Sequence, residues 1–425
     1  MRAVLLIDGE HHPTVVADAV RALPEAGYRP VAALFLGGSE KAASPPDLPC
    51  PVVTGDPGEI LPGLIRSHQA QIVLDWSDEP ILDAPTRFLL AGLSLAAGVS
   101  YRAGGMELDP PPRPRLTDLP AVAVVGTGKR TGKTAVSIEL ARWLRDRTLR
   151  PVVVTMGRGG PPEPLTLLPD EARDPFALFE DLVSRGLHAV SDYVEDAIFA
   201  GVPTVGTRRL GAGPAGVTVS DRFAAGVAVA STLSPDLMIY EGSGTALPPA
   251  HADFTILVTR GDHDPRMLID HLGVVRFAVA DLVVVVGPDR LEDDPVLRRL
   301  GVRRQSIQLV PEATVEVTGR RVMAFTTARG EAAKQVRRHL EEAGAERVEV
   351  FGCLADRPAL GEAVRRIPGD ALVLTEVKAA AAEVVVPAAR AVGADVGLLH
   401  NRPVVTGTDG FDLLGLQVAE ALGLS

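Results

Sequence analysis

The feature that most constrains this chain is a glycine-rich stretch at residues 124–134, VVGTGKRTGKT. An apolar run at residues 121–125 leads into it, and a segment with helical periodicity follows, in which Val136, Leu140 and Leu144 share one face. A loop that joins a strand to a helix turns its backbone N–H groups toward bound anions, and the helix dipole adds partial positive charge. The stretch therefore predicts a phosphate-binding loop in a P-loop NTPase domain.

The spacing of this loop differs from the standard pattern by one residue. The standard pattern is G-x-x-x-x-G-K-[ST], whereas here Gly126 stands one residue early and Thr127 occupies the usual glycine position. We expect Lys133 to reach the β- and γ-phosphates of ATP and the hydroxyl of Thr134 to bind Mg²⁺. The residues expected to contact ATP are Gly126, Thr127, Gly128, Lys129, Arg130, Thr131, Gly132, Lys133 and Thr134.

Two further cations, Lys129 and Arg130, lie inside the loop. They either point to solvent or lean over the γ-phosphate, within one chain or across a dimer interface, as the signature lysine of related P-loop ATPases does. Lys129 stands one residue away from the position of that lysine. We count both residues, with Lys133, as catalytic candidates.

The longer loop resembles that of dethiobiotin synthetase and its relatives among P-loop enzymes, which use ATP to activate an oxyanion and then close a ring. A second stretch agrees with this resemblance: an apolar run at residues 236–240 leads into Glu241-Gly242-Ser243-Gly244, which is similar to the E-G-[AS]-G of that group. There the glutamate helps to hold Mg²⁺, and the resemblance implies this role for Glu241. The other interpretation of Glu241 is a solvated residue at a strand end.

Short apolar runs alternate with helical segments along the whole chain, which predicts βαβ units and parallel sheets covered on both faces. One helical segment, residues 13–27, ends at Gly27. The predicted strands are residues 2–7, 30–36, 71–75, 121–125, 151–155, 236–240, 254–258, 281–286, 321–325, 347–351, 371–375 and 396–400.

A proline-rich segment at residues 109–115, DPPPRPR, is expected to be a linker. It separates an N-terminal Rossmann-like α/β domain, residues 1–108, from a larger P-loop ATP-binding domain, residues 116–425. The last block, residues 313–425, either extends the sheet of the P-loop domain or forms a C-terminal α/β subdomain.

Composition excludes several classes of protein. The net charge of −11 argues against a nucleic-acid partner. No apolar run reaches the length of a transmembrane helix, and the N-terminus reads as a first strand rather than a signal peptide. The two cysteines, Cys50 and Cys353, have no metal-ligand spacing and suit a reducing cytoplasm.

Arginines beside glycines are typical of sites for anions with several oxygens, because a guanidinium bonds bidentately and glycine lets the backbone approach. Arg158 follows one predicted strand, and Arg208 and Arg209 stand in a later stretch, GTRRLGAG. The alternative is ordinary surface loops with scattered charge. We take all three arginines as candidates for substrate binding.

Three other polar clusters are substrate candidates. Asp8, His11 and His12 follow the first predicted strand, and Lys41 ends the stretch at residues 37–41 after the second. Ligands bind at the carboxyl ends of strands in open α/β sheets. The third cluster surrounds Asp192, where dense acids either hold a second Mg²⁺, orient substrate or form a solvated helix face.

Taken together, these stretches resemble the cyclic 2,3-diphosphoglycerate synthetase family over nearly the whole chain. The motifs are IDGEHHP at residues 7–13, LDWSDEP at 74–80, GTGKRTGKTAV at 126–136, SDYVEDA at 191–197, RRLGAGPAG at 208–216 and TEVKAAAAEV at 375–384. The resemblance implies a cytoplasmic ligase that uses ATP and Mg²⁺ to close 2,3-bisphosphoglycerate into a cyclic pyrophosphate, with release of ADP and phosphate.

That reaction suggests a two-step path. The γ-phosphoryl group passes to one substrate phosphate, and the neighbouring phosphate then attacks within the same molecule and expels inorganic phosphate. Because the substrate is already anionic, charge neutralisation and positioning matter more than a general base.

Other functions remain open at this stage. A kinase that makes 2,3-bisphosphoglycerate from 2-phosphoglycerate would stop after transfer, and a P-loop ligase could act on another acid. A nucleotide switch of the kind that dimerises and binds a partner is the rival from another class. Its usual membrane helix is not evident, because residues 413–425 lack basic residues. From related P-loop enzymes we expect a homodimer with no membrane partner.

Overall fold

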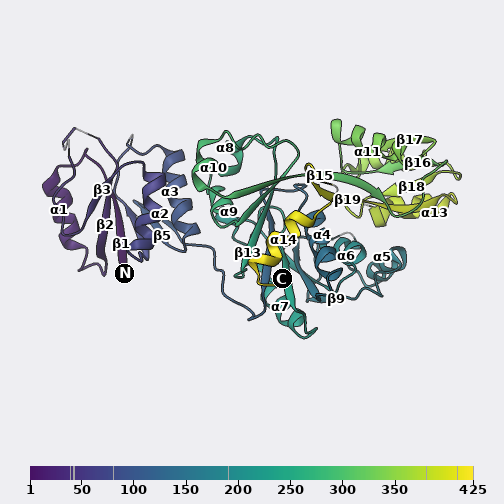
Figure 1. Cartoon of the computed structure of the whole chain (residues 1–425), viewed down its shortest axis with the longest axis horizontal. Coiled ribbons are helices and arrows are strands. Elements are labelled where there is room, and N and C mark those ends of the chain that lie inside the picture. The colour runs from purple at the N-terminus through teal and green to yellow at the C-terminus, as the bar shows by residue number, and fades with distance from the viewer. Residues whose placement is uncertain are drawn as a thin grey trace.

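The computed structural model describes residues 1–38, 40–41, 44–79, 81–189, 191–379, 381–408 and 410–424. Ser39, Pro80, Val190 and Ala380 belong to stretches discussed above and lie outside the described residues. The described chain forms two sheets, arranged in the three lobes of Figure 1. This α/β architecture confirms the predicted fold class.

The N-terminal sheet has the strand order β3-β2-β1-β4-β5-β6, in which only the pairing of β5 with β6 is antiparallel. The order reverses on either side of β1, as in a Rossmann fold. Its elements are β1 (Arg2–Ile7), α1 (Pro13–Ala22), β2 (Arg29–Phe35), β3 (Val52–Thr54), α2 (Pro57–Ser67), β4 (Ile72–Asp75), α3 (Ala84–Ala96), β5 (Ser100–Ala103) and β6 (Met106–Leu108).

Helix α1 is shorter than the sequence predicted. It ends at Ala22 rather than Gly27. Pro24 explains the difference, because proline has no N–H to donate to the carbonyl of Val20. The chain then closes through turns to Gly27, whose φ of 81° is a left-handed conformation.

The second sheet is large, and its first part carries the phosphate-binding loop. Strands run in the order β11-β10-β8-β12-β7-β13-β14-β15, with β9 paired to β10. The strands of this part are β7 (Ala121–Gly126), β8 (Pro151–Gly157), β9 (Leu165–Leu167), β10 (Thr204–Leu210), β11 (Ser220–Asp221), β12 (Leu237–Glu241), β13 (Phe254–Arg260) and β14 (Leu282–Val286). The helices are α4 (Lys133–Arg145), α5 (Pro175–Ser184), α6 (Asp192–Ala200), α7 (Phe223–Ser231), α8 (Pro265–Ile269), α9 (Val274–Ala278) and α10 (Pro295–Leu300), with a 3₁₀ turn at Pro214–Gly216.

The last block continues this second sheet through a pair of long strands. Strand β15 (Arg303–Ala313) pairs with β14 in its first half and antiparallel with β19 (Asp395–Val405) in its second half. Strand β19 in turn pairs with β18, so the hydrogen-bonded order continues as β15-β19-β18-β16-β17. The remaining elements are β16 (Arg321–Phe325), α11 (Glu331–Glu342), β17 (Arg347–Phe351), α12 (Arg357–Val364), β18 (Leu372–Thr375), a π-helical turn (Ala381–Val385), α13 (Val386–Ala391) and α14 (Asp412–Ala421). Figure 1 shows α14 returning to the central lobe, beside α4.

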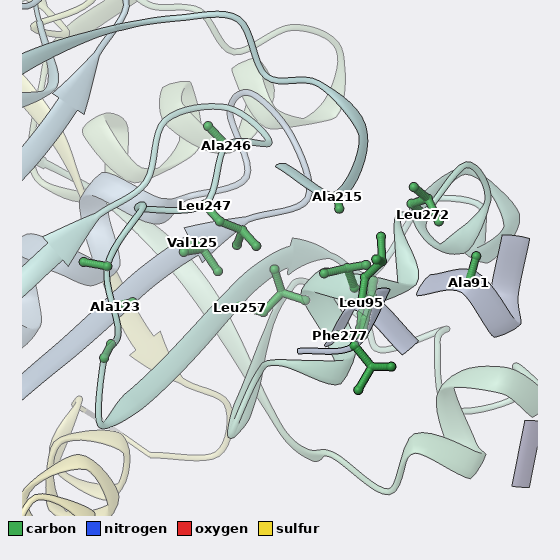
Figure 2. Packing of buried hydrophobic residues seen from close by; sticks show 14 of the residues in the cluster. Ala91, Leu95, Ala123, Val125, Ala215, Ala246, Leu247, Leu257, Leu272 and Phe277 are labelled. Atoms are coloured by element: carbon green, nitrogen blue, oxygen red, sulfur yellow. The ribbon is translucent and has the colours of Figure 1, made fainter. Parts of the chain in front are cut away.

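One apolar cluster runs from the N-terminal sheet into the central lobe. Its contact point is the packing of α3 on α9: a Cβ added at Gly92 would lie 2.3 Å from Cγ1 of Val274. Figure 2 shows Ala91 and Leu95 of α3 next to Leu272 and Phe277. The two lobes therefore share a core, although residues 109–115 between them form neither helix nor strand.

Candidate active site

The phosphate-binding loop begins where β7 ends at Gly126 and finishes where α4 begins at Lys133. Gly126 has no room for a side chain, because a Cβ there would lie 2.6 Å from Cδ of Lys133. Thr127 is tied to the next strand: its N–H donates to the carbonyl of Val258 at 3.2 Å, and its hydroxyl lies 3.0 Å from that of Thr259. The shifted glycine and the extra residue are thus parts of one ordered turn.

Lys133, Thr134 and Glu241 meet at the end of β7. Strand β12, which ends at Glu241, pairs directly with β7. The hydroxyl of Thr134 donates to Oε1 of Glu241 at 2.7 Å, and Nζ of Lys133 donates to the carbonyl of Gly128 at 2.7 Å. Burial lowers the pKa of Lys133, and the charges of Asp192 and Glu241 oppose that shift.

A second carboxyl group, Asp196 of α6, lies against Glu241. Asp196 is fully buried, and no N–H or hydroxyl group of the described residues donates to its oxygens or to Oε2 of Glu241. Burial raises the pKa of Asp196, and the Glu241 carboxyl raises it further. Unsatisfied buried oxygens next to a threonine hydroxyl are the hard donors that Mg²⁺ prefers.

The described residues hold no ready-made group of three or more His, Cys, Asp or Glu side chains for a metal. Mg²⁺ at a nucleotide site takes one or two carboxylates together with phosphate oxygens and water. The hydroxyl of Thr134 and the carboxylate of Glu241, 2.7 Å apart, are donors of that kind, and their magnesium role stays a prediction.

Two arginines border the same site. Arg158 directly follows β8, and Arg209 is the next-to-last residue of β10. A Cβ added at Gly244 would lie 2.4 Å from Nη2 of Arg158 and 3.2 Å from Nη2 of Arg209. Arg209 is buried and donates to the carbonyl of Ser243. Burial, and then the charge of Arg158, lower the pKa of Arg209. Glycine at position 244 leaves the space that both guanidinium groups occupy.

Arg208 lies on the other face of β10, as the alternation of side chains along a strand requires. Its Nε donates to the carbonyl of Pro161 at 3.0 Å, so it braces the loop that follows β8 instead of facing Gly244. Lys129 and Arg130 lie at the exposed tip of the phosphate-binding loop, where Arg130 has a φ of 59°. A role for these two cations over the γ-phosphate stays a prediction.

The acids of α6 are not a solvated helix face. Asp192 is half-buried at the start of the helix, whereas Glu195 and Asp196 are 6% and 0% exposed. Burial raises the pKa of Glu195 to about 7, while the charge of Lys378 opposes this shift. The Nζ of Lys378 lies 3.5 Å from Oε1 of Glu195.

The sequence alone predicts no separate role for Asp196, Glu376 or Lys378. The stretch around Lys378 stands out only through its resemblance to the family. Its approach to α6 depends on the pairing of β15 with β19, which brings together segments far apart in the chain. The one signal in the sequence was the pair of opposite charges in EVK, directly after an apolar strand.

The N-terminal candidates gather at a separate place, the carboxyl end of β1. Asp8 is buried and accepts hydrogen bonds from His11 Nδ1 at 2.8 Å and from the N–H of Asp78 at 2.6 Å. The hydrogen bond to Asp8 raises the pKa of His11, although burial opposes it. Nδ1 of His12 lies 2.9 Å from the hydroxyl of Thr14, and the N–H of Lys41 donates to the carbonyl of Gly9.

This N-terminal cluster lies at the point where the strand order reverses, between β1 and β4, where α/β sheets bind ligands. No hydrogen bond or ion pair joins His11 or Lys41 to the described residues around Lys133. The structure therefore brings the N-terminal candidates together, and separately the P-loop candidates, without a direct contact between the two groups.

The chain matches known proteins along its whole length. Family models match it at residues 2–109 (cyclic 2,3-diphosphoglycerate synthetase, N-terminal domain), 121–318 (the P-loop domain) and 313–402 (the C-terminal domain). Proteins named cyclic 2,3-diphosphoglycerate synthetase are similar to it: that of Rubrobacter xylanophilus is 39% identical over 100% of this chain and 99% of its own. That of Thermococcus kodakarensis is 36% identical over 96% of each chain, and that of Methanothermobacter thermautotrophicus is 35% identical over 95% of this chain and 92% of its own. The chain belongs to the cyclic 2,3-diphosphoglycerate synthetase family.

Proposed function

We propose that this chain is an ATP-dependent ligase that closes 2,3-bisphosphoglycerate into cyclic 2,3-diphosphoglycerate and releases ADP and phosphate. The observation that carries the proposal is the convergence of Lys133, the Thr134–Glu241 pair and two arginines at one sheet edge. This edge belongs to a chain that aligns over its full length with relatives named for that product.

The loop residues would hold the nucleotide. Backbone N–H groups of the loop would face its phosphates, and Lys133 would exchange the carbonyl of Gly128 for a β- or γ-phosphate oxygen. Thr134 and Glu241 would hold Mg²⁺, which when bound supplies positive charge to the phosphates. Lys129 and Arg130 would cover the γ-phosphate.

The chemistry would run in two balanced steps. An oxygen of one substrate phosphate attacks the γ-phosphorus, the bond to the bridging oxygen breaks, and ADP leaves with that electron pair. An oxygen of the neighbouring phosphate then attacks the phosphorus next to the glycerate, which forms the ring anhydride and expels inorganic phosphate. Arg158 and Arg209 would hold the substrate oxygens in line for both attacks.

The other substrate candidates would act around this centre. Arg208 would fix the loop that carries Arg158, and Asp192 would orient the bound acid. Asp8, His11, His12 and Lys41 would close over the substrate from the N-terminal sheet. That last role requires the N-terminal cluster and the P-loop to approach each other when ligands bind.

The first experiment is phosphorus NMR of the purified protein with ATP, Mg²⁺ and 2,3-bisphosphoglycerate. The proposal expects pyrophosphate-type signals on the glycerate, with ADP and free phosphate formed in equal amounts. ADP without free phosphate would indicate a kinase. ATP that stays intact, or that is consumed without change in the bisphosphoglycerate, would move the proposal to another acid or to a nucleotide switch.

We also propose a homodimer in the cytoplasm, without a membrane or nucleic-acid partner. The net charge of −11 supports the last point. Within the described residues, every helix is too short or too polar to span a lipid bilayer. Light scattering on the purified protein, with and without nucleotide, tests the dimer.

A further inference from the structure

Lys378, in the last block of the chain, lies beside the acids of α6 near the nucleotide site. It stands three residues after the end of β18, in the last block of the chain, yet its nearest carboxylate is Glu195 of α6 in the P-loop lobe. Its charge also acts on Lys133, where it lowers the pKa alongside burial. The last block therefore places a cation next to the site that the phosphate-binding loop forms.

The turn that carries Lys378 is held firmly on both sides. The carboxylate of Glu376 accepts hydrogen bonds from the hydroxyls of Thr326 and Thr327, each at 2.8 Å, and from the N–H of Thr327 at 3.0 Å. Val377 is 2% exposed and packs into the apolar cluster of the P-loop lobe. The position of Lys378 relative to α6 is thus fixed by its two neighbours.

The backbone just after Lys378 is unusual. Ala379 has a φ of 51°, a conformation that costs a non-glycine residue energy, and a π-helical turn follows at Ala381–Val385. Both features are common at functional sites. Here they change the direction of the chain just after Lys378, a few residues beyond the end of β18.

The side chain of Lys378 is only partly buried, and its ammonium makes no short hydrogen bond to Glu195. The 3.5 Å to Oε1 of Glu195 is longer than a well-formed hydrogen bond, and 35% of the Lys378 side chain is exposed. Burial lowers its pKa, but the charges of Glu195 and Glu376 outweigh this and raise it, so the group stays charged. Lys378 is a fixed, partly buried cation near another lysine, an arrangement that a bound polyanion stabilises.

The charges of the proposed substrates indicate which polyanion this is. In the proposed function, the loop N–H groups and Lys133 are taken up by the nucleotide phosphates. The acid carries two phosphates and a carboxylate, whereas the two cations proposed to hold it, Arg158 and Arg209, do not match that number of charges. We propose that Lys378 binds a phosphate of the acid substrate, as a third cation supplied by the last block. This inference rests on the proposed function.

The test compares Lys378→Met with Lys378→Arg, which keeps the charge. The control is Arg390→Met, because Arg390 of α13 pairs with Glu180 of α5 and also joins the last block to the P-loop lobe, at the exposed surface. We expect Lys378→Met to raise the KM for 2,3-bisphosphoglycerate about tenfold or more, as for a lost charged contact. The Kd of a non-hydrolysable ATP analogue with Mg²⁺ should change less than about threefold.

Lys378→Arg should recover most of the loss, and Arg390→Met should behave like the wild type. An unchanged KM in Lys378→Met, equal weakening of the analogue, or the same loss in Arg390→Met would overturn the assignment. If the wild type forms no cyclic product, the proposed function fails by itself. Calorimetric binding of 2,3-bisphosphoglycerate to the analogue-loaded protein then tests Lys378 directly, and no binding by the wild type overturns both.

Discussion

Lys133 is the residue on which turnover should depend most. Its ammonium is buried and rests on the carbonyl of Gly128, ready to exchange that partner for a phosphate oxygen. Lys133→Ala should lower kcat by about 10²–10³-fold, the usual cost of one fixed charge on a transition state. Steady-state ADP release measures this, with Lys334→Ala, at an exposed position of α11, as the control. Near-normal ATP consumption by Lys133→Ala would refute the assignment of the loop.

Glu195 should make stability depend on pH. Its pKa in the folded chain is about 7, against an ordinary 4.5, because it is buried. Between these values the folded chain keeps a proton that the unfolded chain releases, so the free energy of unfolding falls as pH rises through this window. The contribution is on the order of 3 kcal/mol, at about 1.4 kcal/mol per pKa unit.

Urea unfolding at pH values from about 4.5 to 8 measures this dependence. Glu195→Gln should show a shallower decline than the wild type, because its amide does not titrate. The control Glu25→Gln, at an exposed position, should keep the wild-type slope. Equal slopes for Glu195→Gln and the wild type would contradict the prediction.

At this scale the sequence predicted what is local. Gly126, Lys133 and Thr134 are close in the chain, and Glu241 is marked by the strand before it and the glycines after it. Asp196 and Lys378 could not be assigned in the same way. Their partners are set by tertiary structure, and a short run of acids reads equally well as a solvated surface until burial is known.

At the scale of elements, the close contact of α3 with α9 limits which side chains position 92 can carry. Gly92 allows the two helices to touch, since a Cβ there would lie 2.3 Å from Val274. Gly92→Val should destabilise the chain by about 1–3 kcal/mol through overpacking. The control is Gly63→Ala in α2, where a Cβ meets nothing within 4 Å and should add about 0.5–1 kcal/mol of helix stability. Denaturant midpoints of both variants test this, and a neutral Gly92→Val would disprove the close contact.

Elements were predicted best where they are apolar throughout. The strands β7, β8, β12, β13 and β14 were all expected within one or two residues. Strand β10 was missed because its TVGTRRL sequence carries glycine and two arginines, and β15 because half of RRQSIQLVPEA is polar. Strand β10 borders the site, and β15 passes from the central lobe to the last block. Neither strand is buried along its whole length, so neither has a continuous apolar sequence.

For the whole molecule, the shared core implies that the first two lobes unfold together. The chain has two tryptophans: Trp76 packs in the N-terminal lobe and Trp143 on α4. Trp143→Phe and Trp76→Phe therefore report each lobe separately by fluorescence. We expect the same urea midpoint from both variants. When Gly92→Val is added to Trp143→Phe, the remaining Trp76 should report unfolding of the N-terminal lobe at a lower urea concentration. Different midpoints without Gly92→Val would show that the α3–α9 contact does not couple the lobes.

The arrangement of lobes was only partly predictable. The sequence indicated parallel sheets and a break at residues 109–115, but left open whether the last block extends the central sheet. The pairing of β15 with β19 joins residues about 90 positions apart, and no local pattern records which distant strand will be a neighbour. The structure makes the hydrogen-bonded sheet continuous across that pair.

The β15–β19 pair also suggests how the gene for this chain could be shortened. The N–H of Thr314 donates to the carbonyl of Leu398, so the polypeptide leaves the central lobe and re-enters it at adjacent points before α14 packs on α4. Residues 315–397 therefore stand where a β-hairpin would have its turn. A segment joined at two neighbouring points of one strand pair can be exchanged for a tight turn without moving the strands of the nucleotide-binding lobe. A shortened gene that rejoins Thr314 to Leu398 would encode that hairpin and would lack Lys378.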